Sequence, residues 1–168
     1  MPRNRPGALR AAQLIPGAAP RATPRADPRA PRSAPPTRVH GLSARTSDAI
    51  DRVERLSGDY YLYPGATDRA LREYRAFLRP TGRRPLYPRV AQCSCRGCSF
   101  DDVRHARDVL DQVLRQLPPR PRAELVRRVR PLDAVYLERT LPDPFARQRQ
   151  YRADLWWRRR LASGAEGG

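Results

Sequence analysis

The chain contains no lysine, one asparagine and only two isoleucines among its 168 residues. All 34 of its basic residues are therefore arginines, a bias that resembles the composition encoded by very GC-rich genomes. This bias weakens an argument from arginine content alone, but it does not affect the sign of the charge. The formal net charge is +17 at pH 7. A surface this basic attracts polyanions such as nucleic acid or acidic protein surfaces.

Long apolar runs are also absent. No stretch approaches the roughly 20 apolar residues that a membrane-spanning helix needs. Arg10 and Gln13 interrupt the one candidate apolar stretch near the N-terminus, so a secretory signal is not expected. Three cysteines lying close together are too few for a secreted disulfide framework. We therefore expect a cytoplasmic protein without a membrane span.

The sequence lacks the usual patterns of an active site. No Gly-rich phosphate loop, Ser-His-Asp arrangement or pair of catalytic carboxylates is recognisable. Histidine-based catalysis has few options, because His40 and His105 are the only histidines. We expect a protein that is not an enzyme, and the sequence identifies no small-molecule substrate.

Proline and charge divide the chain near residue 45. Residues 1–45 carry nine of the 19 prolines, nine arginines and a single acid, Asp27. Prolines spaced three or four residues apart prevent a continuous helix, and too little apolar surface is present to offset the entropy of ordering. We predict a disordered cationic Pro/Arg-rich arm over 1–45, an α-helical domain over 46–163 and a flexible tail over 164–168.

Within the domain, apolar residues repeat with the period of an α-helix and show no lasting alternation typical of strands. Ile50, Val53 and Leu56 share one face of the first expected helix, which stops near Gly58. We predict an all-α fold, a small bundle of about five short helices with a cysteine-bearing loop over 80–98. Further helical segments are expected from Thr67 to Pro80, from Ser99 to Pro118, from Pro121 to Pro131, from Leu132 to Leu137, and from Asp143 to Trp157.

The strongest helical signal starts at Ser99. Ser99 and Asp102 have the spacing of a capping box, with Asp in place of the usual Glu. Leu110 and Leu114 lie one turn apart on the apolar stripe that follows. His105 falls on the polar side of this stripe.

All three cysteines lie within six residues, directly before this helix. Three thiolates folded against a histidine of the first turns would form a tetrahedral site of three sulfurs and one nitrogen, a known structural zinc ligand set. The sequence therefore predicts a zinc ion held by Cys93, Cys95, Cys98 and His105. Alternative fourth ligands are Asp101, Asp102 and His40.

Two other interpretations of the cysteine cluster stay open. Cys95 and Cys98 form a C-x-x-C pair just before a helix, where thiol pKa values fall, and this spacing suits a redox pair. No strand-helix-strand pattern surrounds the motif, although that context is what makes such a pair persuasive. The third interpretation is a tight turn whose thiols bind nothing.

Two arginine-rich runs are candidate nucleic-acid contacts. Aromatic side chains beside arginine can stack on bases while guanidinium groups hold phosphates. The alternative for both runs is that the arginines form a solvated face. In the second run at least one tryptophan would then pack into the core, because neighbours on a helix point about 100° apart. The candidates are Arg120, Arg122, Arg127, Arg128 and Arg130 in the first run, and Trp156, Trp157, Arg158, Arg159 and Arg160 in the second.

Together these patterns predict a small basic protein without catalytic activity, stapled by zinc, that associates with nucleic acid mainly through phosphate contacts. No segment resembles a module that reads bases, so we expect weak sequence specificity. The alternative is a protein-interaction adaptor that docks an acidic partner through Trp, Tyr and Arg surfaces. A further alternative is a thiol redox sensor.

Overall fold

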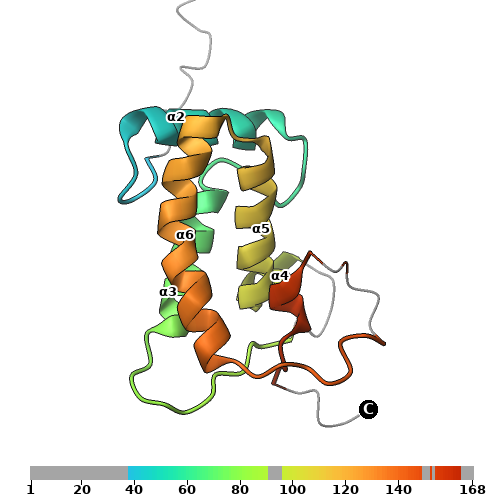
Figure 1. The fold of residues 1–168 in the computed structure, drawn as a ribbon. Helices are drawn as coiled ribbons and strands as arrows, with labels where there is room; N and C mark the ends of the chain where they lie inside the picture. Colours follow the sequence, from blue (N-terminus) through green and yellow to red (C-terminus); the bar gives the residue numbers. More distant parts are fainter. Residues whose placement is uncertain (1–37, 91–95, 149–151, 153, 164–168) are drawn as a thin grey trace, which may run out of the picture. The chain divides into compact units, whose positions relative to one another are not determined.

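Five α-helices and one short 3-10 helix form the described part of the chain in a computed structural model (Figure 1). The structure describes residues 38–90, 96–148, 152 and 154–163. No strand occurs among these residues, which confirms the predicted all-α bundle. In chain order the elements are α2 (Ala44–Leu56), α3 (Ala66–Leu78), α4 (Arg96–Asp101), α5 (Val103–Gln116), α6 (Pro119–Arg139) and the 3-10 helix η1 (Trp156–Arg159).

Helix α5 lies at the centre of the bundle and contacts all the other helices, including η1. Helices α3, α5 and α6 run alongside one another, and α2 crosses one end of them (Figure 1). Leu110 and Val113 of α5 are completely buried. His105 is buried as well, although the sequence predicted a polar side for this helix there. The prediction fails because the C-terminal segment and the loop before α3 cover that side.

Side chains distant in the sequence fix the starts of α2 and α3. Ser43 caps α2, and its hydroxyl donates to Glu124 of α6 at 2.8 Å. Glu54 is buried and accepts hydrogen bonds from the N–H groups of Gly65 and Thr67, both at 2.7 Å. Gly65 has a φ of 92°, a left-handed conformation that glycine adopts without strain. These contacts satisfy helix-end donors that would otherwise have no partner.

The folded domain begins before the predicted boundary at residue 45. Val39 and Leu42 are 2% and 6% exposed and belong to the hydrophobic core. Assigning 38–45 to the arm was therefore wrong. Two isolated aliphatic side chains are too few to show a period in the sequence, and only the tertiary contacts reveal that they are buried. Residues 1–37 and 164–168 lie outside the described residues.

The helix predicted from Ser99 is divided in two. Helix α4 ends at Asp101, and α5 begins at Val103 after Asp102, whose backbone is extended. The carboxylate of Asp102 accepts a hydrogen bond from the N–H of Arg104 at 2.9 Å. The N-cap is therefore Asp102 and not Ser99, because an aspartate that bonds the following turn starts a new helix.

Pro131 does not end α6, contrary to the prediction. The helix continues through this residue, which is exposed, so water can solvate the carbonyl that loses its N–H partner. Leu125 and Val129 before the proline and Tyr136 after it are all buried in one core. Packing of this shared face outweighs the local cost of the proline.

The helix predicted from Asp143 to Trp157 is also wrong in its described part. Residues 144–148 form turns, and only four residues wind into η1. Asp143 does act as a local cap, since its carboxylate accepts from the N–H of Phe145 at 2.9 Å. None of the described helices combines the length and the apolarity that a bilayer crossing requires.

Candidate functional site

The arginines of the domain fall into those neutralised by a carboxylate and those without such a partner. The most buried pair joins Arg104 to Asp102, with 3% and 4% of the two side chains exposed and 2.7 Å between Nη2 and Oδ2. Other pairs lie within single helices at the surface, such as Arg115 with Asp111. Counting buried and surface pairs together, the carboxylates that form an ion pair with an arginine are Asp51, Asp68, Glu73, Asp102, Asp108, Asp111, Asp133 and Asp154.

A network of charged side chains is buried between α3, α5, α6 and η1. Arg107 donates from Nε and Nη2 to the two carboxylate oxygens of Asp133, at 2.9 and 3.0 Å. The hydroxyl of Tyr74 donates to Asp133 at 2.9 Å, and burial next to this carboxylate raises the pKa of Tyr74 far above its usual range. The Arg107 guanidinium carbon also lies 4.2 Å from the centroid of the Trp157 ring. Arg107 and Asp133 neutralise each other inside the fold, so we do not assign them to a ligand site.

Trp157 offers no face on which a base could stack. Its side chain is 1% exposed, and its indole Nε1 donates to Asp108 at 2.7 Å. Trp156 is half-buried and packs edge-on against Tyr136, with 5.9 Å between ring centroids. The structure therefore corrects the assignment of Trp157 as a nucleic-acid contact, and it places this member of the pair in the core.

The arginines after the tryptophan pair hold the C-terminal segment on the bundle. Arg158 donates from Nε to Asp108 at 2.9 Å. Arg160 donates from Nε to the hydroxyl of Thr140 at 2.8 Å, and burial lowers the pKa of Arg160 from its usual value. Arg159 is half-buried. Arg158 and Arg160 thus have structural partners inside the fold, and their role as nucleic-acid contacts stays a prediction.

All five predicted arginines of α6 are exposed, but two of them bond to the backbone of other segments. Arg122 donates from Nη2 to the carbonyl of Arg115 at 3.2 Å. Arg128 donates from Nε to the carbonyl of Gly41 at 3.0 Å and so ties the segment before α2 to α6.

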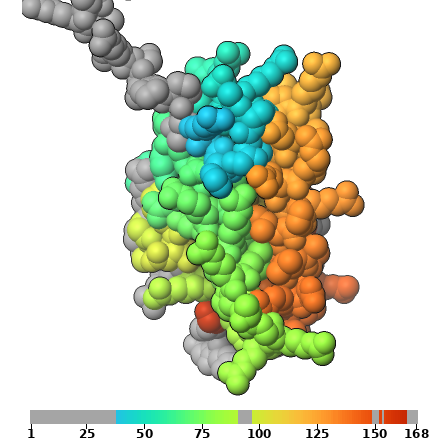
Figure 2. Space-filling view, turned by 90° about the vertical axis from the view of Figure 1, so that its left-hand side faces the viewer, coloured from blue at the N-terminus to red at the C-terminus, as the bar shows by residue number. Residues whose placement is uncertain are grey.

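The other three arginines form what we call the outer face of α6, defined as Arg120, Arg127 and Arg130. At 100° per residue they lie within an arc of about 80° on the side of the helix opposite its buried residues. None of them has an ion-pair partner among the described residues. Figure 2 shows α6 along one edge of the molecule, with side chains projecting into solvent.

Glu124 lies between these arginines in the sequence but is already engaged. It accepts from the backbone N–H and the hydroxyl of Ser43, at 2.7 and 2.8 Å, and from the hydroxyl of Thr46. These hydrogen bonds lower the pKa of Glu124 from its usual value. The carboxylate therefore links α6 to α2. The nearby charge of Arg127 also lowers the pKa of Glu124, but the two residues form no ion pair among the described contacts.

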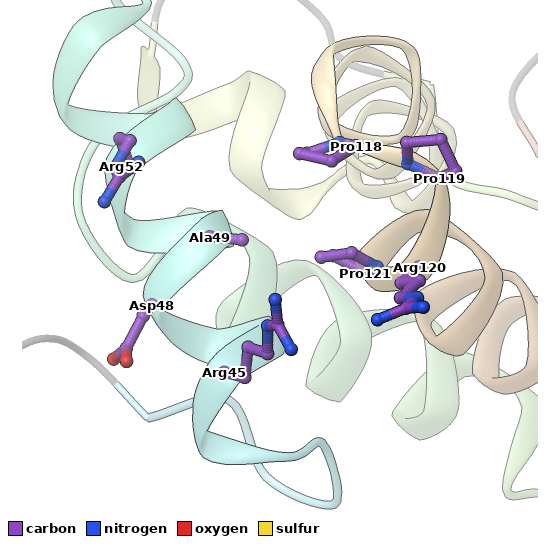
Figure 3. Close-up of a pocket in the computed structure, with 8 residues that line it drawn as sticks. All are labelled: Arg45, Asp48, Ala49, Arg52, Pro118, Pro119, Arg120 and Pro121. Atoms are coloured by element: carbon purple, nitrogen blue, oxygen red, sulfur yellow. The ribbon is translucent and has the colours of Figure 1, made fainter.

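Two adjoining pockets lie beside α2: one of about 650 Å³ between α2 and the start of α6, and one of about 250 Å³ between α2 and the end of α5. In Figure 3, Arg45 of α2 and Arg120 of α6 extend toward one another across the larger pocket, whereas Asp48 points away from it. Arg52 borders both pockets. The sequence analysis did not single out Arg45 and Arg52. Their spacing of seven residues, on the side of the helix away from Ile50, is the signal that could have found them.

The predicted metal site lies only partly within the described residues, since Cys93 and Cys95 are outside them. Cys98 is half-buried on α4, and His105 lies in the first turn of α5. In the part of the chain that the structure describes, no three His, Cys, Asp or Glu side chains form a group that could hold a metal ion. The zinc site and the C-x-x-C redox pair both stay predictions.

His105 has the surroundings of a neutral imidazole. Its side chain is 9% exposed, and its ring centroid lies 4.5 Å from that of Tyr61 and 5.9 Å from that of Phe100. Burial lowers the pKa of His105 from its usual value, and its Nε2 has no hydrogen-bond partner among the described residues. A neutral imidazole with an unbonded nitrogen is the form that binds a metal ion.

Asp102, one of the alternative fourth ligands, is already engaged in an ion pair. Both carboxylate oxygens of Asp102 accept hydrogen bonds from the guanidinium group of Arg104, within a buried pair. A metal ion would have to break this pair and leave a buried arginine without its counter-ion. Asp101 is exposed at the end of α4, and His40 is exposed before α2.

Comparison of the chain with protein-family models, curated proteins and solved structures finds no match.

Proposed function

We propose that this protein associates with nucleic acid, mainly through phosphate contacts made by the outer face of α6. The observation that carries the proposal is the set of three exposed guanidinium groups that pair with no carboxylate of the described residues, in a domain that pairs many of its other arginines. Guanidinium groups bind phosphate oxygens through two parallel hydrogen bonds. Contacts of this kind position a protein on nucleic acid without reading its sequence.

The dimensions of the outer face suit a phosphate backbone. From Arg120 to Arg130 the helix rises about 15 Å, which corresponds to roughly four phosphate steps along one strand of a duplex. Residues 1–37 contribute seven further arginines against a single acid. We expect both regions to add to affinity through counterion release, which makes binding strongly dependent on salt.

The same proposal includes a structural zinc ion held by Cys93, Cys95 and Cys98, with His105 as the fourth ligand. Its support is the buried Nε2 of His105, which has no hydrogen-bond partner within the described part of the chain, together with the position of Cys98 on the short helix just before α5. A metal bound there would tie the cysteine segment to α5 and would stabilise the fold without providing catalysis. The reducing cytosol, where thiols persist, suits such a site.

The nucleic-acid proposal is tested by salt-dependent binding of a fluorescent 20-base-pair duplex to the full chain. The variant Arg127→Gln/Arg130→Gln removes two phosphate contacts, so its slope of log K against log salt should flatten by about 1.8. The matched control is Arg79→Gln/Arg83→Gln, which removes the same charge from exposed residues after α3. An equal flattening in the control, or binding that salt does not weaken, would show that the outer face is not the contact surface.

The zinc proposal is tested by elemental analysis of the protein purified under reducing conditions. One zinc per chain is expected, with loss of metal in Cys98→Ser and weaker retention in His105→Gln. A metal-free protein would remove zinc from the proposal and leave the duplex experiment unaffected. Retention of zinc in His105→Gln at full affinity would reject His105 as a ligand.

A further inference from the structure

A groove runs along α2, over the two adjoining pockets between this helix and the turn that joins α5 to α6. Pro118 forms part of its opposite wall. The α2 residues that line it are spaced by three or four positions or are adjacent, so they form one continuous stripe about 16 Å long. These residues are Arg45, Asp48, Ala49, Arg52, Val53 and Leu56, and the carboxylate of Asp48 points away from the larger pocket (Figure 3).

The two ends of the groove differ in chemistry. At one end the guanidinium groups of Arg45 and Arg120 extend toward each other (Figure 3), and neither has an ion-pair partner among the described residues. At the other end, Leu56 is 78% exposed, which is the highest exposure among the large hydrophobic side chains described. A ligand that fills the groove must therefore supply negative charge at one end and apolar surface at the other.

The charge of the chain itself argues against an occupant from this protein. Residues 1–37 contain seven arginines and one acid, and residues 38–168 contain 27 arginines and 16 acids. The arm or a second copy would thus bring net positive charge to a groove whose arginines Arg45, Arg52 and Arg120 have no ion-pair partner in the described part of the chain. A nucleic-acid backbone would satisfy the arginines, but its phosphates and sugars offer no apolar side chain to cover Leu56.

We propose that this groove docks an acidic peptide segment of another protein. Its carboxylates would pair with Arg45 and Arg52, and one apolar side chain would cover Leu56 and Val53. This surface shares only Arg120 with the outer face of α6, and the inference does not depend on nucleic-acid binding. Arg120 is the one residue that belongs to both surfaces, so the test leaves it unchanged.

The test is a selection of random 12-residue peptides, displayed on phage, against the nuclease-treated full chain. Twelve residues span about 18 Å as a helix and more when extended, so either form covers the groove. The enriched peptides should carry net negative charge and at least one large apolar residue. Fluorescence anisotropy of the resynthesised peptides at 150 mM salt then gives their affinities.

Groove variants should weaken peptide binding more than matched controls do. Arg45→Gln/Arg52→Gln should weaken it roughly tenfold, and Leu56→Ser several-fold. The control Arg79→Gln/Arg83→Gln should change binding less than twofold. All of these side chains are exposed, so circular dichroism melting should show intact folds.

Several results would overturn the proposal. These are failure to enrich acidic peptides, an equal loss of affinity in the control variant, or displacement of the peptide by a dT12 oligonucleotide that itself needs Arg45 and Arg52. A concentration-dependent dimer abolished by Leu56→Ser would assign the groove to a second copy. Peptide binding that survives in Arg127→Gln/Arg130→Gln is expected, and its loss would show that the two surfaces are not separate.

Discussion

The substitution Asp133→Asn tests whether the buried charge network holds α6 against α5. The amide has nearly the same shape as the carboxylate, so the change removes charge without opening a cavity. Arg107 would then keep a buried positive charge with no counter-ion, and its Nη1 already lacks a partner among the described residues. Breaking a fully buried pair in this way costs about 3–5 kcal/mol. Asp133 is partly exposed at 18%, so we expect a loss of about 2–3 kcal/mol in the free energy of unfolding.

The measurement is urea unfolding at pH 7, followed by far-ultraviolet circular dichroism and by tryptophan fluorescence. The matched control is Asp111→Asn, which breaks the exposed pair with Arg115 on α5 and should cost less than about 0.5 kcal/mol. The double variant Arg107→Met/Asp133→Asn should recover part of the loss, because the unpaired charge is gone. Equal costs for the two single variants would refute the reasoning, since the network would then behave like a solvated surface pair.

Three further changes follow from the same contacts. Removing residues 1–37 should leave the melting temperature unchanged, whereas removing 1–45 should destabilise the domain by at least about 3 kcal/mol, because two buried aliphatic side chains are lost with it. Burial lowers the pKa of His105, so as the pH falls its imidazole is protonated in the unfolded chain at a higher pH than in the folded chain. The free energy of unfolding should therefore be highest above about pH 6.5 and should fall as the pH drops below that value. Urea midpoints at pH 7.5 and 5.5 measure this loss, and His105→Gln should reduce it. Pro131→Ala restores a backbone donor inside α6 and should raise stability by about 1–2 kcal/mol in thermal unfolding, while an unchanged midpoint would mean that the proline costs nothing there.

The period of apolar residues predicted the main helices because each one buries a single stripe. It did not predict where that stripe ends around the helix. Leu56 was placed on one face with Ile50 and Val53, yet it is exposed, because six residues rotate the side chain 120° away from the buried position. The break at Asp102 and the continuation through Pro131 also depend on tertiary contacts, which local preferences cannot show.

The candidate site was harder to predict, because it depends on which arginine side chains are exposed and which already bond to other parts of the fold. Neither property can be read from the sequence of residue types. The arginines of α6 look equivalent in the sequence, but Arg122 and Arg128 bond to carbonyls of other segments while Arg127 does not. Trp157 stands beside three arginines, as in an aromatic and basic binding motif, and yet it fills the core. Arg45 was assigned to the arm and so was never considered as part of a helix face.

The distribution of charge gives the domain two kinds of arginine with different roles. At α5 and η1 the guanidinium groups are paired with carboxylates: Arg107 joins α5 to Asp133 of α6, and Arg158 joins η1 to Asp108 of α5. Arg45 and Arg52 of α2 and the three arginines of the outer face of α6 have no ion-pair partner among the described residues, and their mutual repulsion falls when an anion binds. A ligand with negative charge that binds these arginines should therefore also stabilise the fold. This stabilisation by the ligand should act on α2 and α6 and should leave the buried network of Arg107 unchanged.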